Sequence, residues 1–184
     1  MIVIGITGTL GAGKGTVVEF LVKEKDFVHF SVRDYLSDII KSRGMKVNRD
    51  TMVVTANELR RINGPAFIIE ELYRKASSTG KNCIIESIRT PGEIEKLRQY
   101  DNFYLLAINA DIIIRYERIQ MRGSETDNVD FKTFGENEER EMHSDDPNKQ
   151  NLSECIKQAD YILNNNGTIK ELKEKMENIL KDIL

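Results

Sequence analysis

The sequence predicts an α/β fold in which a five-stranded parallel sheet is flanked by helices, giving three layers in a single domain. Apolar runs of four to eight residues alternate along the chain with longer segments of helical period, as in parallel sheets with crossover helices. The runs are apolar at nearly every position, which strands buried on both faces require. With 184 residues, 40% of them apolar and only three prolines, the chain suits one compact domain with a sizeable core.

The expected strands are the short apolar runs, which cover residues 2–7, 27–31, 82–86, 103–109 and 161–164. The expected helices are the longer periodic segments, which cover residues 14–25, 33–43, 50–62, 65–77, 91–99, 111–121, 131–142 and 168–184. Each strand but the last is thus followed by at least one helix before the next strand, which is the order of a parallel sheet.

Several helix starts carry the residues that helix ends require. Asp111 and Thr168 have side chains that can cap a helix, and Thr168 with Glu171 forms a capping box. Pro65 and Pro91 are suited to a first helical turn. The boundaries of these helices therefore have local chemical support.

Composition and charge exclude several classes of protein. The 27 basic and 30 acidic residues give a net charge of −3, so the chain as a whole does not attract nucleic acid or anionic lipid. Cys83 and Cys155 lack the spacing of a disulfide framework or a zinc site. The apolar run 1–6 is too short for a signal peptide or a membrane span. We expect a cytoplasmic protein that binds neither membranes nor nucleic acid.

The strongest functional signal is the glycine-rich run GTLGAGKGT at residues 8–16, between the first strand and the first helix. Glycine permits unusual dihedral angles and lets backbone N–H groups approach phosphate closely, while a lysine adds charge for the β- and γ-phosphates. The run therefore predicts a phosphate-binding loop, a P-loop NTPase fold, and ATP with Mg²⁺ as cofactors. Its candidate nucleotide-binding residues are Gly8, Gly11, Ala12, Gly13, Lys14, Gly15 and Thr16. The alternative is a glycine-rich turn with a surface lysine.

A glycine, Gly15, follows Lys14 where most such loops have serine or threonine. The residue after the lysine therefore has no hydroxyl for Mg²⁺, and phosphates, water, Thr16 or a carboxylate must hold the metal. Glu86 ends a predicted buried strand at the carboxyl edge of the sheet, where ligands of such sheets gather. Thr16 and Glu86 are the candidate metal ligands, and Glu86 is alternatively a base that accepts a proton from an acceptor hydroxyl.

Two regions interrupt the alternation of strands and helices. Residues 33–78 place three helical segments between the second and third strands, and residues 123–150 are polar and charged. We interpret the first region as a helical insert that binds the phosphoryl acceptor and the second as a short lid. The alternative for the second region is a solvated surface loop.

The run at residues 8–16 resembles the loop of adenylate kinases and other nucleoside monophosphate kinases, which share the glycine after the lysine. Three further segments of this chain, residues 84–90, 117–122 and 159–168, resemble segments of these kinases in the same order. The resemblance implies that Arg89 binds the acceptor phosphate, that Glu86 lies near Mg²⁺, and that Arg118 lies against the adenine. It further implies that Arg122 reaches phosphates and that Asn166 and Gly167 border the base.

The chain also resembles adenylate-kinase-related proteins of archaea and bacteria, which carry similar ELR and ERDERE-like segments. These segments point to Arg60 in the insert and to Arg140 in the lid, because Asn137 stands where a lid arginine is expected. Residues 30–37 align with the acceptor segment of adenylate kinases and supply Ser31, Arg33 and Asp34 as candidate acceptor contacts, although Ser37 replaces an arginine there. Lys14, Glu86, Arg89, Arg122 and Arg140 form the expected catalytic set.

These features predict a phosphotransferase that moves the γ-phosphoryl group of ATP to a nucleoside or deoxynucleoside monophosphate. One alternative is a dephospho-CoA kinase, although the second strand lacks the acidic pair of those enzymes unless Asp34 substitutes for it. Another is a nucleotide-dependent regulator or slow ATPase. His29 and His143 are expected to be packed or solvated without a functional partner. The expected partner is a small nucleotide, and the expected assembly is a monomer or homodimer.

Overall fold

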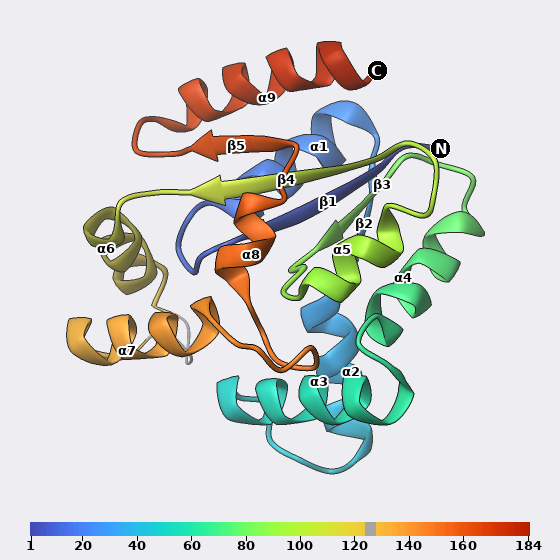
Figure 1. Cartoon of the computed structure of the whole chain (residues 1–184). Helices are drawn as coiled ribbons and strands as arrows, with labels where there is room; N and C mark the ends of the chain where they lie inside the picture. Colours follow the sequence, from blue (N-terminus) through green and yellow to red (C-terminus); the bar gives the residue numbers. More distant parts are fainter. Residues whose placement is uncertain (124–127) are drawn as a thin grey trace.

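The computed structural model describes residues 1–123 and 128–184 and contains one five-stranded sheet (Figure 1). Its strands are β1 (Val3–Gly8), β2 (Val28–Ser31), β3 (Cys83–Glu86), β4 (Phe103–Asn109) and β5 (Tyr161–Asn164). They are all parallel and lie in the order β2-β3-β1-β4-β5. The predicted five-stranded parallel sheet is therefore confirmed.

The helices follow the strands as the periodicity predicted. They are α1 (Lys14–Lys25), α2 (Val32–Ser42), α3 (Arg49–Asn63), α4 (Phe67–Ser77), α5 (Pro91–Leu97), α6 (Ile112–Arg122), α7 (Phe131–Met142), α8 (Leu152–Lys157) and α9 (Ile169–Ile183). The predicted capping box of Thr168 and Glu171 is present at α9, and Asp111 caps α6. Pro91 occupies the first turn of α5, where Thr90 and Glu93 form another capping box.

Two local expectations were wrong. The prediction placed Pro65 inside a helix, but α4 begins two residues later at Phe67. The short helix α8 was not predicted, because its six residues are too few to show a helical period. Its N-terminus does carry a capping signal, since the Asn151 side chain accepts a hydrogen bond from the backbone N–H of Glu154.

Alternate residues of the central strand β1 enter two separate cores. Ile4 and Ile6 pack with α1 and α9 on one face of the sheet. Val3 packs on the other face in a core to which α2–α5 and α8 contribute. Gly5 faces this second core, where an added Cβ would lie 2.6 Å from Ile88 Cδ1, so a larger residue would not fit. Figure 1 shows α9 and α1 on one side of the sheet and α4, α5 and α8 on the other, which gives three layers.

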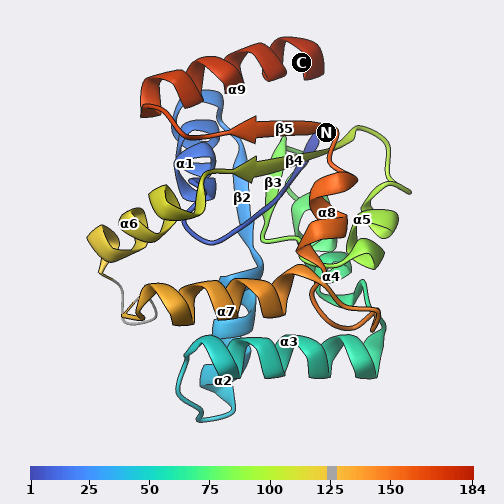
Figure 2. The ribbon, with the colours of Figure 1, turned by 60° about the vertical axis from the view of Figure 1, so that its left-hand side comes forward.

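The two regions that interrupt the alternation lie beside each other. Helices α2, α3 and α4 fill the predicted insert 33–78, and α7 lies in the predicted lid 123–150. Both Figure 1 and Figure 2 show α7 alongside α3. Residues 124–127 of the expected lid lie outside the described residues. Within the described residues, no helix has the length and apolar character that crossing a membrane requires.

Candidate active site

Three glycines shape the loop between β1 and α1. Gly8, Gly11 and Gly13 have φ values of 130°, 80° and 103°, which L side chains rarely adopt. An added Cβ at Gly8 would lie 2.0 Å from the Ile108 carbonyl oxygen, and one at Gly11 would lie 2.5 Å from the Arg115 carbonyl oxygen. The loop conformation therefore depends on glycine both for dihedral angle and for space. It brings the N-terminus of α1, with its unpaired N–H groups, to the end of the sheet.

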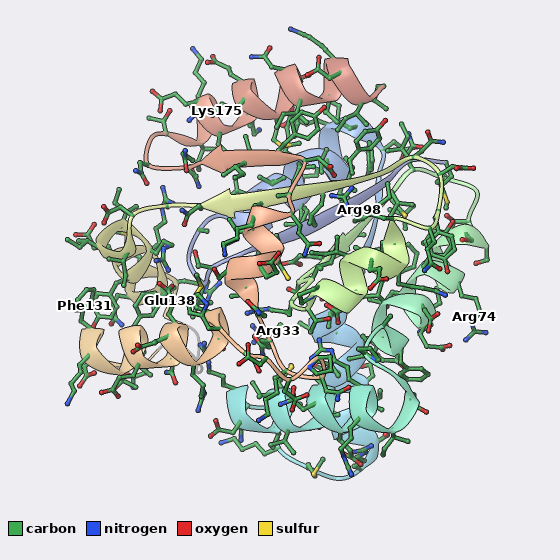
Figure 3. All side chains as sticks on the ribbon, in the orientation of Figure 1. Arg33, Arg74, Arg98, Phe131, Glu138 and Lys175 are labelled. Carbon is green, nitrogen blue, oxygen red and sulfur yellow. The ribbon has the colours of Figure 1, made fainter. Side chains whose placement is uncertain are left out.

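Side chains from distant segments hold this loop from outside. Asn165, only 7% exposed, donates from Nδ2 to the Ala12 carbonyl oxygen at 2.8 Å. Arg115 on α6 donates from Nη1 to the Leu10 carbonyl oxygen at 3.3 Å, and its guanidinium pairs with Glu138 on α7. Figure 3 shows Glu138 between these two helices. The loop is thus braced by the segment after β5 and, through Arg115, by α7.

Asn165 was not predicted to be a site residue, whereas its neighbours Asn166 and Gly167 were. The Asn166 side chain accepts a hydrogen bond from the Asp111 backbone N–H at 2.8 Å, so it joins the starts of α6 and α9. Gly167 does line the cavity described below. Asn165 directly follows β5, and nothing in the sequence distinguished it from Asn166.

The Lys14 side chain folds back onto the glycine-rich loop. Its Nζ donates to the carbonyl oxygens of Gly8 and Thr9, both at 2.8 Å. Burial of the ammonium and then the nearby charge of Arg89 lower the pKa of Lys14 to about 7, although Glu86 and Glu141 oppose this shift. A bound phosphate would supply the negative charge that the lysine lacks in the free protein.

Glu86 at the end of β3 is paired with His29 on the adjacent strand β2. His29 Nε2 and Glu86 Oε2 are 3.1 Å apart. Burial raises the pKa of Glu86, but the His29 hydrogen bond and the charge of Lys14 outweigh it and lower the pKa below its usual value. Glu86 is therefore an ionised carboxylate. The sequence did not predict this pair, because the register of β2 against β3, which creates it, is not visible in the sequence.

A cavity of about 800 Å³ joins the loop to the helical insert. Twelve of the predicted site residues line it: Gly11, Gly13, Lys14, Gly15, Thr16, Arg33, Arg60, Glu86, Arg89, Arg118, Arg122 and Gly167. Its volume lies in the upper part of the usual range for ligand pockets, about 300–1,000 Å³. The structure thus brings together residues from the loop, the insert, β3, α6 and the segment after β5.

Other predicted site residues lie outside the cavity wall. Gly8, Ala12 and Asn166 do not line the cavity. Ser31 caps α2 by accepting a hydrogen bond from the Asp34 backbone N–H at 3.1 Å, and Asp34 is exposed in the first turn of that helix. Arg140 points away, with a side chain that is 55% exposed and lies 4.0 Å from Asp50. Ser31, Asp34 and Arg140 are therefore not brought to the site in this conformation.

At the end of the cavity that the insert forms, several charged side chains make ion pairs. Only some of these residues were predicted from the sequence. Glu141 on α7 accepts from Arg49 Nη2 at 2.5 Å and from Arg89 Nη1 at 2.9 Å. Gln150 Oε1 also accepts from Arg89 Nη1, at 3.1 Å. The ERDERE-like segment that pointed to Arg140 ends at Glu141, so it contained the missed residue. Arg49 had no signal in the sequence beyond its place at the start of α3.

Arg60 lies behind this cluster in a buried ion pair. Its Nε and Nη2 donate to Glu93 Oε1 at 3.1 and 2.8 Å, and the side chains are only 1% and 0% exposed. Glu93 Oε2 in turn accepts from the backbone N–H groups of Arg89 and Thr90. Arg60 Nη1 is buried without a hydrogen-bond partner among the described residues.

The residues present fit ATP with Mg²⁺. An added Cβ on Gly15 would meet no atom of the described chain within 4 Å, so its lack of a side chain leaves open space on the cavity side. Thr16 and Glu86 both line the cavity and carry the oxygen donors that Mg²⁺ prefers. Arg118 Nη1 is buried without a partner among the described residues and lies in the same wall.

Solved structures of known proteins share this architecture. A protein of Thermus thermophilus, TT1252, superimposes with a TM-score of 0.66 at 17% identity, covering 100% of this chain and 98% of that one. Shikimate kinase from Bacteroides thetaiotaomicron superimposes with a TM-score of 0.56 at 16% identity, covering 98% of each chain. The predicted P-loop NTPase fold is confirmed, while the resemblance to adenylate kinases stays a prediction.

Sequence comparison gives relatives along the whole chain. A UPF0200 protein of Methanococcus maripaludis is 30% identical over 188 residues, which cover 100% of this chain and 98% of the relative. A UPF0200 protein of Sulfurisphaera tokodaii is 30% identical over 191 residues, which cover 99% and 97%. A family model described as an AAA domain matches residues 4–144, from β1 to just beyond α7. The chain therefore belongs to the UPF0200 family and carries an AAA domain with a kinase-like P-loop fold.

Proposed function

We propose that this protein is an ATP-dependent phosphotransferase whose acceptor is a nucleoside or deoxynucleoside monophosphate. The observation that carries the proposal is the single cavity that joins the phosphate-binding loop to a second, cationic end in the helical insert. At that end Arg33, Arg49, Arg60 and Arg89 supply positive charge beside apolar side chains, namely Val32, Leu36, Met52, Val53 and Ala56. A phosphate joined to a flat base matches both properties.

The proposal gives roles to the following cavity residues. Lys14 and the loop N–H groups bind the β- and γ-phosphates, and Arg89 and Arg122 stabilise charge on the transferring group. Arg118, Gly167 and Ile169, which all line the cavity, border the adenine. Bound Mg²⁺, held by Thr16 or Glu86, supplies further positive charge to the phosphates. Residues 33–78 form the acceptor-binding insert and residues 123–150 the lid.

Phosphoryl transfer requires the protein mainly to position the reactants and to supply positive charge. An oxygen of the acceptor phosphate forms a bond to the γ-phosphorus while the bond from that phosphorus to the β–γ bridging oxygen breaks, releasing ADP. An acceptor phosphate is ionised at neutral pH, so no base has to remove a proton. A site rich in arginine suits this reaction.

A panel of ribonucleoside and deoxyribonucleoside monophosphates tests the proposal. ADP release from ATP and Mg²⁺ should be stimulated strongly by a particular monophosphate, and the phosphorylated product should appear with matching stoichiometry. Lys14→Met, with the loop otherwise intact, serves as the inactive control. If no monophosphate stimulates ADP release, the proposed acceptor class is wrong.

The pair of His29 and Glu86 favours a second candidate, a kinase of an acceptor hydroxyl such as that of dephospho-CoA. A hydroxyl must lose its proton during transfer, and an ionised Glu86 held by His29 is a suitable base. Adding dephospho-CoA to the acceptor panel separates the two candidates. ATP hydrolysis that no acceptor stimulates would instead indicate a nucleotide-dependent regulator or slow ATPase.

A further inference from the structure

The carboxylate of Glu141 lies where the proposed acceptor's anionic group is expected. Its two oxygens are divided between two arginines, with Oε1 at 2.5 Å from Arg49 Nη2 and Oε2 at 2.9 Å from Arg89 Nη1. Arg89, Arg49 and Glu141 all line the cavity that begins at Lys14. The Glu141 side chain is 9% exposed, so its carboxylate interacts with these guanidinium groups largely out of water.

The surrounding groups have more hydrogen-bond donors than Glu141 uses. Arg60 Nη1 and Arg49 Nε are both buried without partners among the described residues. Both arginines line the cavity, and Arg60 is 1% exposed. A carboxylate has two oxygens, both taken up here, whereas a phosphate monoester has three terminal oxygens and a charge of up to −2. A phosphate therefore offers Arg49 and Arg89 one more oxygen and up to one more negative charge than Glu141 does.

The start of α3 adds positive charge at this end of the cavity. Arg49 is the first residue of α3, and Asn48, which caps that helix, also lines the cavity. The N-terminus of a helix carries partial positive charge. The insert therefore presents Arg49 and a helix N-terminus to a carboxylate that belongs to α7.

We propose that Glu141 is an intramolecular substitute for the acceptor's phosphate, and that a phosphate-bearing acceptor binds by displacing it from Arg49 and Arg89. This inference rests on the proposed function for the identity of the acceptor. In the free protein Glu141 neutralises the arginines and joins α7 to the insert. A phosphate monoester that takes the same arginines releases this link, so acceptor binding and the α7 contact exclude each other.

The test uses inorganic phosphate as the probe and the full chain loaded with Mg²⁺ and a non-hydrolysable ATP analogue. The analogue occupies the phosphate-binding loop, so added phosphate reports on the second site. In calorimetric titrations Glu141→Gln should bind phosphate about tenfold more tightly than the wild type, because a neutral amide competes poorly for two arginines. Adding Arg49→Met to Glu141→Gln should abolish this gain.

Glu138→Gln is the matched control. Glu138 lies one turn before Glu141 on the same helix and also pairs with an arginine, Arg115, but neither residue lines the cavity. Its loss should not tighten phosphate binding. If Glu141→Gln does not fold, Glu141→Asp keeps the charge on a side chain one methylene shorter, too short for both arginines, and should show a smaller gain of about threefold.

A folded Glu141→Gln protein that binds phosphate no more tightly than the wild type would overturn the inference and leave Glu141 as a structural ion-pair partner. Because no turnover is measured, this outcome is independent of the acceptor panel. Tighter phosphate binding by Glu141→Gln without any active monophosphate would keep the inference and reject the proposed function. If a monophosphate is phosphorylated but Glu141→Gln binds phosphate no more tightly than the wild type, the proposed function is kept and the inference about Glu141 is rejected.

Discussion

At the residue scale, Lys14 has a charge that depends on what is bound beside it. Its pKa of about 7 in the free protein leaves the amine mostly neutral at pH 8. A triphosphate favours the ammonium and raises the pKa, so binding of ATP at pH 8 should take up about one proton. At pH 6 the amine is already protonated, and the uptake should vanish.

Calorimetric titration with ATP and saturating Mg²⁺, which keeps the γ-phosphate deprotonated at pH 6, in two buffers of different ionisation enthalpy measures this uptake. The observed binding enthalpies should differ between the buffers at pH 8 and agree at pH 6. Lys14→Arg is the control, because a guanidinium stays charged at both pH values and should abolish the difference. Identical enthalpies for the wild type at pH 8 would contradict the lowered pKa of Lys14.

Two glycines of the same loop are required for different reasons. Gly13 has a φ of 103°, and an added Cβ would lie 2.3 Å from Asn165 Nδ2, whereas Gly15 is helical and meets no described atom. We expect Gly13→Ala to destabilise the free protein by about 1–3 kcal/mol. Gly15→Ala should instead keep the stability or raise it by up to about 1 kcal/mol, because alanine favours the helix.

Thermal unfolding with and without ATP and Mg²⁺ separates these effects. For a chain of this size each kcal/mol corresponds to about 2–4 °C in Tm. Gly13→Ala should lower the Tm of the free protein, while Gly15→Ala should leave it unchanged or raised but lose much of the stabilisation by ATP, because its methyl group enters the cavity. Full stabilisation of Gly15→Ala by ATP would show that the space at Gly15 does not serve the nucleotide.

At the scale of elements, the buried pair of Arg60 and Glu93 joins the insert to α5. Arg60 belongs to α3, and Glu93 caps α5 while its second oxygen binds the backbone N–H of Arg89. Arg60→Met should cost about 3–5 kcal/mol of stability, because it leaves a buried carboxylate without its partner. Arg60→Met combined with Glu93→Gln should recover part of this loss.

Urea unfolding of the single and double variants measures the effect. Arg43→Met is the matched control. Arg43, at the end of α2, pairs with Glu58 on α3, the helix that carries Arg60, but both side chains are 36% exposed. It should cost less than about 1 kcal/mol. A cost for Arg60→Met as small as that of Arg43→Met would mean that water reaches the pair and that the insert is held by other contacts.

At the scale of the whole molecule, the two cysteines report on opening of the fold. Cys83 on β3 and Cys155 on α8 are 0% exposed and belong to the same core. Burial raises the pKa of Cys83 to about 11 and that of Cys155 to about 12, so neither forms a thiolate readily at pH 8. We expect a disulfide reagent to modify the native protein slowly and the urea-unfolded protein at once.

ATP with Mg²⁺ should slow modification of the native protein further, since a ligand that binds only the folded state lowers the population of opened molecules. The absorbance of the released thiolate follows both reactions directly. Rapid modification of one thiol in the native protein, without unfolding, would show that its side of the core opens locally.

The sequence determined the features that depend on neighbouring residues. The run from Gly8 to Thr16, the alternation of apolar runs with helical segments, and capping pairs such as Thr168 with Glu171 are all local, and each was confirmed as structure. The fold class and twelve of the cavity residues follow from these local signals combined with a resemblance to known kinases.

Only the tertiary structure decided which of these residues meet and what else joins them. The pair of His29 and Glu86 depends on the register of two strands separated by the whole insert, and the contacts of Glu141 with Arg49 and Arg89 depend on how α7 packs beside α3. Packing also leaves the Arg140 side chain exposed and buries that of Glu141, although the two residues are adjacent in the sequence. Periodicity fixes the direction of a side chain relative to its own helix, whereas long-range packing fixes what that side chain faces.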